Sequence, residues 1–169
     1  MIIPGTGGLV FSEPGMDAVM IRADPESVFF LSYGMDEKKR RHTMRVTAGR
    51  DDIDLLGHVN NLVYMRWVQD IAIAHWMQDA PEPDKMNLMW VVTRHEVDFK
   101  RQAFEGDEII VQTWVGRAHR RLFERFTEII RESDGKLLAQ CKTVWCPIDP
   151  TTGRPTTVSE EVRRRFSVE

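Results

Sequence analysis

Cysteine is scarce in this 169-residue sequence, which has only Cys141 and Cys146. Their odd spacing would place them on opposite faces of one strand, so they are poor disulfide partners. So few cysteines are typical of a reducing compartment. No apolar run approaches the roughly 20 residues that a membrane helix needs, and residues 28–31 are too short for the core of a signal peptide. We therefore expect a cytoplasmic protein with no membrane partner.

Several motifs that mark other classes of enzyme are also missing. The five histidines lack metal-binding spacing, and there is no Cys-x-x-Cys pair. No Gly-x-Ser-x-Gly elbow of a serine hydrolase is present. Residues 5–8 are rich in glycine, but no strand precedes them, so they are not a dinucleotide fingerprint. The net charge of −3 argues against a nucleic-acid partner. We expect no metal and no cofactor.

The composition is that of a soluble globular domain, with 42% hydrophobic and 29% charged residues. The length suits one domain with a real core. Glycine and proline recur through residues 1–38, which we interpret as an irregular N-terminal extension in which residues 28–31 could dock as a short strand or turn. Residues 39–169 are then the folded domain.

The strongest helix signal covers residue 60 to about residue 78. Apolar and aromatic side chains recur there at helical spacing: Tyr64, Trp67, Val68, Ile71 and His75. Asn60 or Asn61 can cap the helix, since an asparagine side chain accepts from the free amides of the first turn. Two prolines at residues 81 and 83 end it.

The remaining segments are predicted strands. One at residues 41–48 precedes the helix. A run of about four hairpin-linked strands follows, at residues 88–99, 109–115, 121–131 and 137–146, before a short terminal helix at residues 159–166. One long helix must bury its apolar face, and an antiparallel sheet curled around it is the economical solution. The predicted class is α+β.

The segment just ahead of the helix carries the chemistry. Residues 52–64 read Asp-x-Asp-x-x-Gly-His-Val-Asn-Asn-x-x-Tyr, with Trp67 one turn further on. A carboxylate beside the amide-rich start of a helix can act as a base or nucleophile next to an oxyanion site. This pattern resembles the signature of hotdog-fold acyl thioesterases of the 4-hydroxybenzoyl-CoA thioesterase-like family, from about residue 40 to about residue 155. The resemblance implies a hotdog fold and a homodimer or homotetramer.

The resemblance also implies roles for four residues. Asp54 would attack the thioester or activate water, and the backbone amide of Asn61 would polarise the carbonyl. Gly57 would permit a positive φ or a close approach by the thioester. His58 would orient the loop or take part directly. Plant acyl-carrier-protein thioesterases look similar here and use Asp-x-Asn-x-His, but Leu56 replaces that asparagine. Asp52 is expected to be structural.

Other residues are candidates for substrate binding. Tyr64 and Trp67 are core residues that could form part of an acyl pocket, and Asn60 either caps the helix or touches substrate. A second apolar set suits an acyl chain, although core packing explains it more simply: Trp76, Met77, Met86, Met89 and Trp90. Five basic residues could meet the phosphates of coenzyme A: Lys100, Arg101, Arg117, Arg120 and Arg121.

The resulting hypothesis is an acyl-CoA thioesterase that hydrolyses a thioester to a carboxylic acid and free CoA. One alternative is an acyl-carrier-protein thioesterase, whose acidic partner the basic residues could meet. The other is an acyl-CoA-binding module without turnover, since Leu56 leaves the polar cluster sparse. Retention of Asp54 favours an enzyme.

Overall fold

The computed structural model describes residues 40–166, all within one compact unit, Lys38–Glu169. The expectations for residues 1–38 lie outside this range. The elements are β1 (His42–Thr47), the 3₁₀ turn η1 (Arg50–Asp52), α2 (Asn61–Asp79), α3 (Glu82–Asn87), β2 (Met89–Phe99), β3 (Glu108–His119), β4 (Leu122–Arg131), β5 (Leu137–Ile148) and α4 (Glu160–Arg165). The predicted α+β class is confirmed.

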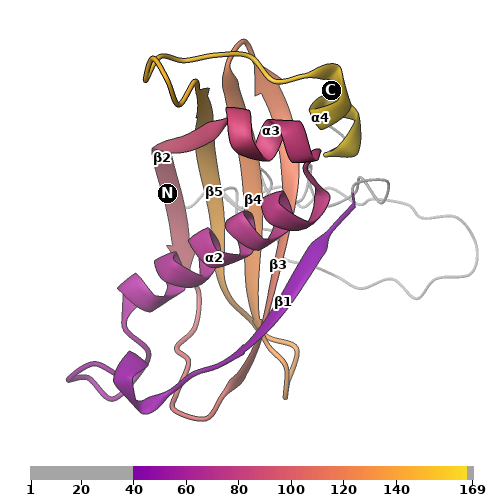
Figure 1. Ribbon diagram of the computed structural model, residues 1–169. Coiled ribbons are helices and arrows are strands. Elements are labelled where there is room, and N and C mark those ends of the chain that lie inside the picture. The colour runs from indigo at the N-terminus through magenta and orange to yellow at the C-terminus, as the bar shows by residue number, and fades with distance from the viewer. Residues whose placement is uncertain (1–39, 167–169) are drawn as a thin grey trace, which may run out of the picture. The chain divides into compact units, whose positions relative to one another are not determined.

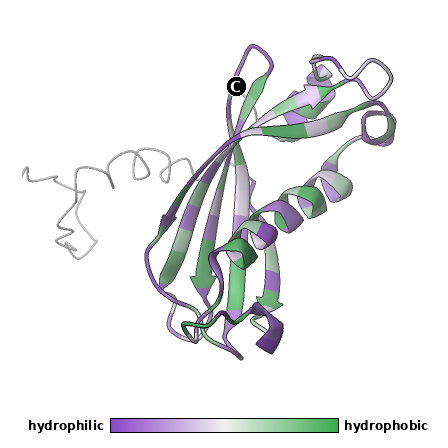
Figure 2. Cartoon of the chain, turned by 90° about the vertical axis from the view of Figure 1, so that its left-hand side faces the viewer, coloured by the Kyte–Doolittle hydropathy of each residue, from purple (hydrophilic) through white to green (hydrophobic). Residues whose placement is uncertain are grey.

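The five strands form one antiparallel sheet in the order β1-β3-β4-β5-β2, and α2 lies across one face of it (Figure 1). Hydrophobic and hydrophilic residues alternate along the strands, as the pleat requires when a sheet has one covered face (Figure 2). Both cysteines lie on β5, and both are buried and free, as their spacing predicted.

The expectation that all four later strands are linked by hairpins is wrong for β2. Only β3, β4 and β5 follow one another as hairpins, whereas β2 pairs with β5 and β1 pairs with β3. After residue 99 the chain therefore crosses from the β2 edge of the sheet to β3, the strand beside the opposite edge, β1. This crossing is tied down by backbone hydrogen bonds, in which Val59 N donates to Ala103 O (2.8 Å) and Ala48 N donates to Asp107 O (2.9 Å).

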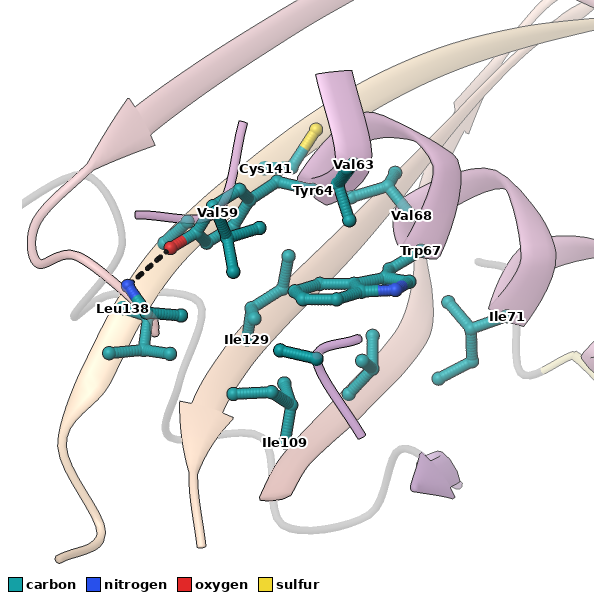
Figure 3. Packing of buried hydrophobic residues seen from close by; sticks show 14 residues of the cluster. Val59, Val63, Tyr64, Trp67, Val68, Ile71, Ile109, Ile129, Leu138 and Cys141 are labelled. Atoms are coloured by element: carbon teal, nitrogen blue, oxygen red, sulfur yellow. Dashed lines mark hydrogen bonds between the residues drawn. The ribbon is translucent and has the colours of Figure 1, made fainter. Parts of the chain in front are cut away.

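The inner face of α2 builds the main core. Tyr64, Trp67 and Ile71 are all buried, as the helical spacing predicted. Trp67 packs among Val68, Ile71, Ile109 and Ile129 (Figure 3). Burying each large apolar side chain stabilises the fold by about 1.5–3 kcal/mol, so this contact fixes α2 on the sheet.

A second apolar cluster lies at the C-terminal end of α2. It joins α2, α4 and the neighbouring strand ends through Leu88, Val115, Phe123, Val162 and Phe166. The short helix α3 was not expected, because the two prolines indicated only an end to α2. Pro81 is its N-cap and Pro83 lies in its first turn, where a missing amide donor costs nothing. No helix among residues 40–166 is long and apolar enough to cross a membrane.

Candidate active site

Asp54 lies in a tight turn between η1 and α2. The amide of Gly57 donates to Asp54 O (3.0 Å), and the amide of Asp54 donates to His58 O (3.0 Å). Gly57 adopts φ +80°, a conformation that other residues enter at a cost. The expected need for a positive φ at Gly57 is confirmed.

Only one oxygen of the Asp54 carboxylate accepts a hydrogen bond within this turn. Its Oδ1 accepts from the Leu56 amide at 2.8 Å and lies 3.8 Å from His58 Nδ1. Its Oδ2 has no hydrogen-bond partner among residues 40–166. The side chain is 23% exposed, so one oxygen stays available to a water molecule or a substrate.

Asp52, by contrast, holds the loop together, as expected from the sequence. Oδ2 accepts from the Gly49 amide (2.9 Å), and Oδ1 pairs with Arg66 Nη2 (2.6 Å). Burial alone would raise the pKa of Asp52, but the Arg66 guanidinium and the Gly49 amide outweigh it and hold the pKa below its usual value.

The start of α2 presents one unused amide. Asn60 is the N-cap, and its Oδ1 accepts from Leu62 N (2.9 Å) while its carbonyl accepts from Val63 N (2.9 Å). Capping is therefore the role of the Asn60 side chain. The amide of Asn61 has no acceptor within the described part of the chain, which leaves a donor at the positive end of the helix dipole.

A small pocket of about 160 Å³ opens beside this amide. Its lining brings together five of the residues proposed from the sequence, His58, Asn61, Tyr64, Lys100 and Arg101, and adds Val59, Phe99 and Gln102. Phe99 and Gln102 went unnoticed, because only the pairing of β2 with β5 carries the end of β2 to this place, whereas Val59 is the sequence neighbour of His58.

Tyr64 forms the floor of this pocket. Its hydroxyl accepts from the Ala103 amide (3.0 Å), and its ring meets Phe99 edge to face at 5.5 Å. Burial raises the pKa of Tyr64, so the phenol stays neutral. Trp67 lies in the core and lines neither this pocket nor the larger one described below.

Arg117, Arg120 and Arg121 lie at the other end of the sheet, in or beside the β3–β4 turn. Trp145 of β5 pairs with both Val92 and Phe123, whereas Ala139 pairs with Phe99. Val92 and Phe99 are about 23 Å apart along β2. Within one chain, the three arginines therefore do not meet Lys100 and Arg101.

The larger cavity, of about 350 Å³, lies at the C-terminal end of α2. Four residues of the second apolar set from the sequence line it, Trp76, Met77, Met89 and Trp90, together with Phe123, Trp145, Phe166 and Arg125 among others. Arg125 was missed. It shares one buried face of β4 with Phe123, Thr127 and Ile129, and a charged residue on that face is the signal that could have found it.

Arg125 is held by neutral partners. Its Nη1 donates to His75 Nδ1 (3.0 Å) and to Thr113 Oγ1 (3.2 Å). Because a guanidinium only donates, His75 carries its proton on Nε2, which lies 3.5 Å from Asp79 Oδ2. Burial lowers the pKa of His75 to about 3 and that of Arg125 to about 10, so at neutral pH the imidazole is uncharged and the guanidinium is charged.

The model of the thioesterase-like superfamily matches residues 49–166, a range that contains the Asp54 turn, α2 and both pockets. The chain belongs to the thioesterase-like superfamily. The Asp54 turn and α2 therefore lie within the region that the family model matches, and the resemblance seen in the sequence is confirmed.

Named relatives in this superfamily act on different thioesters. A palmitoyl-acyl carrier protein thioesterase of Gossypium hirsutum is 35% identical over 108 residues, which cover 59% of this chain and 26% of that protein. The chain spans about a quarter or less of the length of the curated relatives that it matches.

Solved structures share the fold. A 1,4-dihydroxy-2-naphthoyl-CoA thioesterase from Synechocystis superposes with a TM-score of 0.67 at 15% identity, covering 76% of this chain and 96% of that one. A Staphylococcus aureus protein solved in complex with CoA gives 0.69 at 15% identity, covering 76% and 83%. The predicted hotdog fold, a curled sheet around one long helix, is confirmed.

Proposed function

We propose that the protein is a thioester hydrolase that cleaves acyl-CoA, with Asp54 as base or nucleophile. The observation that carries the proposal is that one carboxylate oxygen and one amide at the start of α2 are both free to bind a ligand. Asp54 Oδ2 and the Asn61 N–H both lack partners among the described residues. Asn61 lines the pocket together with His58 and Tyr64, whereas Asp54 does not line it and adjoins it through His58, whose Nδ1 lies 3.8 Å from Asp54 Oδ1. An activated thioester needs little more than these two groups.

Two reaction paths fit this arrangement. In the first, Asp54 takes a proton from water while the water oxygen bonds to the thioester carbonyl carbon. In the second, Asp54 itself bonds to that carbon, and water later hydrolyses the anhydride. In both, the Asn61 amide stabilises the negative carbonyl oxygen, the carbon–sulfur bond breaks, and the thiolate takes up a proton. Single turnover in ¹⁸O-labelled water tests the second path, because water that attacks the Asp54 carbonyl of the anhydride leaves label in Asp54, which direct hydrolysis never does.

The thiol that carries the acyl group can belong either to CoA or to a carrier protein. Lys100 and Arg101 line the pocket beside Asn61, where they can meet the phosphates of CoA. The identity with palmitoyl-acyl carrier protein thioesterases favours a carrier protein as the alternative. Thiol release from a panel of acyl-CoA substrates, each matched to the same acyl group on a carrier protein, tests both. Tight binding without thiol release from any of them would instead favour a binding module.

We further propose that the protein acts as a homodimer, which could pair again to a tetramer. β2 is a long edge strand with exposed apolar side chains, Met89 at 57%, Val91 at 43% and Phe99 at 44%. Such an edge pairs readily with a second strand. Two copies of β2 paired antiparallel about a two-fold axis would continue the sheet and cover these side chains.

A further inference from the structure

The larger cavity holds a charge that the proposed reaction does not use. Arg125 is 8% exposed and lines the cavity, yet its Nε and Nη2 atoms have no acceptor among residues 40–166. No carboxylate in this part of the chain lies within ion-pair distance of it. The wall also contains two buried indole N–H groups, those of Trp90 and Trp145, for which the described part of the chain offers no acceptor. The cavity wall therefore presents donors that no acceptor among residues 40–166 satisfies.

The other charged groups near the cavity are already paired. Glu124 lies 2.6 Å from Lys142, and Lys85 lies 2.6 Å from Glu82.

Asp79 reaches Arg125 only through the neutral His75 ring, and its Oδ2 also lies 3.6 Å from Arg40. A buried guanidinium without a direct carboxylate is costly, and an anion brought by a ligand would offset that cost.

We propose that this cavity binds the acyl group of the thioester and that Arg125 binds a carboxylate at the far end of that group. The preferred substrates are then thioesters of dicarboxylic acids. This inference rests on the proposed function. A volume of about 350 Å³ with aromatic walls suits the apolar middle of such an acyl group, and a guanidinium can hold a carboxylate by two parallel hydrogen bonds.

The acyl group would enter this cavity from the partner's active site. The cavity adjoins the start of β2, at Met89 and Trp90, whereas the pocket beside Asn61 adjoins its end, at Phe99. Antiparallel pairing of two β2 strands sets the start of one beside the end of the other. The Asp54 turn of one chain thus faces the Arg125 cavity of its partner.

Binding can be tested without turnover, because three tryptophans line the cavity and report through their fluorescence. Wild-type protein is titrated with monomethyl suberate, dimethyl suberate and methyl octanoate, of which only the first carries a carboxylate. We expect the first to bind about 10–100-fold more tightly, the usual scale for hydrogen bonds to a charged group. Equal binding of all three probes would overturn the role of Arg125.

Variants test whether Arg125 causes the preference for monomethyl suberate. Arg125→Met should abolish the preference for monomethyl suberate, and Arg125→Lys should restore part of it. Arg45→Met, at an exposed position on β1, is the matched control and should leave it unchanged. If Arg125→Met does not fold, Ala72→Leu fills the cavity without touching Arg125 and should weaken all three probes together. Unchanged binding to Ala72→Leu would place the ligand elsewhere.

A mixed dimer tests the shared site. Asp54→Asn should be nearly inactive alone, and Arg125→Met should bind suberyl-CoA about 10–100-fold more weakly. At a suberyl-CoA concentration well below the KM of Arg125→Met, a mixed dimer of the two chains has one intact site and should show about half of the wild-type rate, well above either parent. No recovery in a purified mixed dimer would show that both residues must belong to one chain. Absence of thiol release from every substrate would refute the proposed function, while the titrations would still decide what the cavity binds.

Discussion

Asp54 is the residue on which the proposed chemistry depends. Asp54→Asn keeps the shape of the turn and removes the base, so kcat should fall by about 10²–10⁴-fold, the scale of general-base loss. Asp51→Asn is the matched control, because Asp51 is an exposed carboxylate of η1 close in sequence. Its thiol-release rate should equal that of the wild type. A folded Asp54→Asn protein with normal turnover would rule out this assignment.

His75 should make stability depend on pH. Burial lowers its pKa from 6.5 to about 3, so below pH 6.5 the unfolded chain takes up a proton that the folded protein refuses. Above pH 6.5 both states carry a neutral His75, so this residue does not lower the free energy of unfolding there. The free energy of unfolding falls as the pH drops toward 3, by about 1.4 kcal/mol per pH unit.

Urea unfolding of His75→Gln across this window measures the effect. We expect a shallower loss of stability toward acid than in the wild type. Some dependence should remain, because burial also lowers the pKa of His42 and His95. His119→Gln, at the exposed end of β3, should follow the wild-type curve. The same slope in His75→Gln and wild type would mean that His75 is not the group responsible.

The first turn of α2 allows the amide of Asn61 to be separated from its side chain. Asn61→Ala keeps the amide and should leave kcat near the wild-type value. Asn61→Pro removes the amide, yet proline is well tolerated at the first position of a helix, and Asn60 already has the extended backbone (φ −62°, ψ 140°) that precedes a proline.

Loss of one oxyanion donor typically costs about 10²–10³-fold in kcat, which is the fall expected for Asn61→Pro. Circular dichroism and thermal unfolding check that the helix persists. Equal kcat values for the alanine and proline variants would exclude the amide from the reaction.

Elements set by local pattern were predictable from the sequence. The periodicity that ends in Trp67 and Ile71 predicted α2, and asparagine before it predicted the cap. Asp54 and His58, just ahead of this helix, were proposed from their motif and the family resemblance, and their roles stay predictions. The place of β2 beside β5 was not predictable, because strand order depends on contacts distant in sequence. For that reason the place of Phe99 in the pocket escaped notice, and Lys100 was grouped with arginines at the opposite end of the sheet. Arg125 was missed although its charge in the buried register of β4 was a local signal.

At the scale of the assembly, the same antiparallel pairing would bring the β3–β4 arginines of one chain toward the Asp54 site of the other. If Arg117, Arg120 and Arg121 hold CoA phosphates, replacing them with glutamine should raise KM about tenfold and leave kcat nearly unchanged, because the contacts are remote from the carbonyl. The effect should shrink at high salt. A pantetheine thioester lacks the nucleotide, and an equal rise in its KM would contradict phosphate binding.

Dimerisation through β2 is the condition for a shared active site. Val91 is exposed on this strand, so Val91→Asp would place a charge in the paired β2 edges and desolvate it, which should separate the chains. Thr43→Asp puts the same charge on the opposite edge strand, β1, and should leave the dimer intact. Light scattering gives the mass and thiol release gives the activity of the same samples. We expect Val91→Asp to be monomeric and at least tenfold less active, since each Asp54 turn then lacks the partner's cavity. A wild-type monomer that is fully active at assay concentration would remove the need for a partner, and with it the shared site.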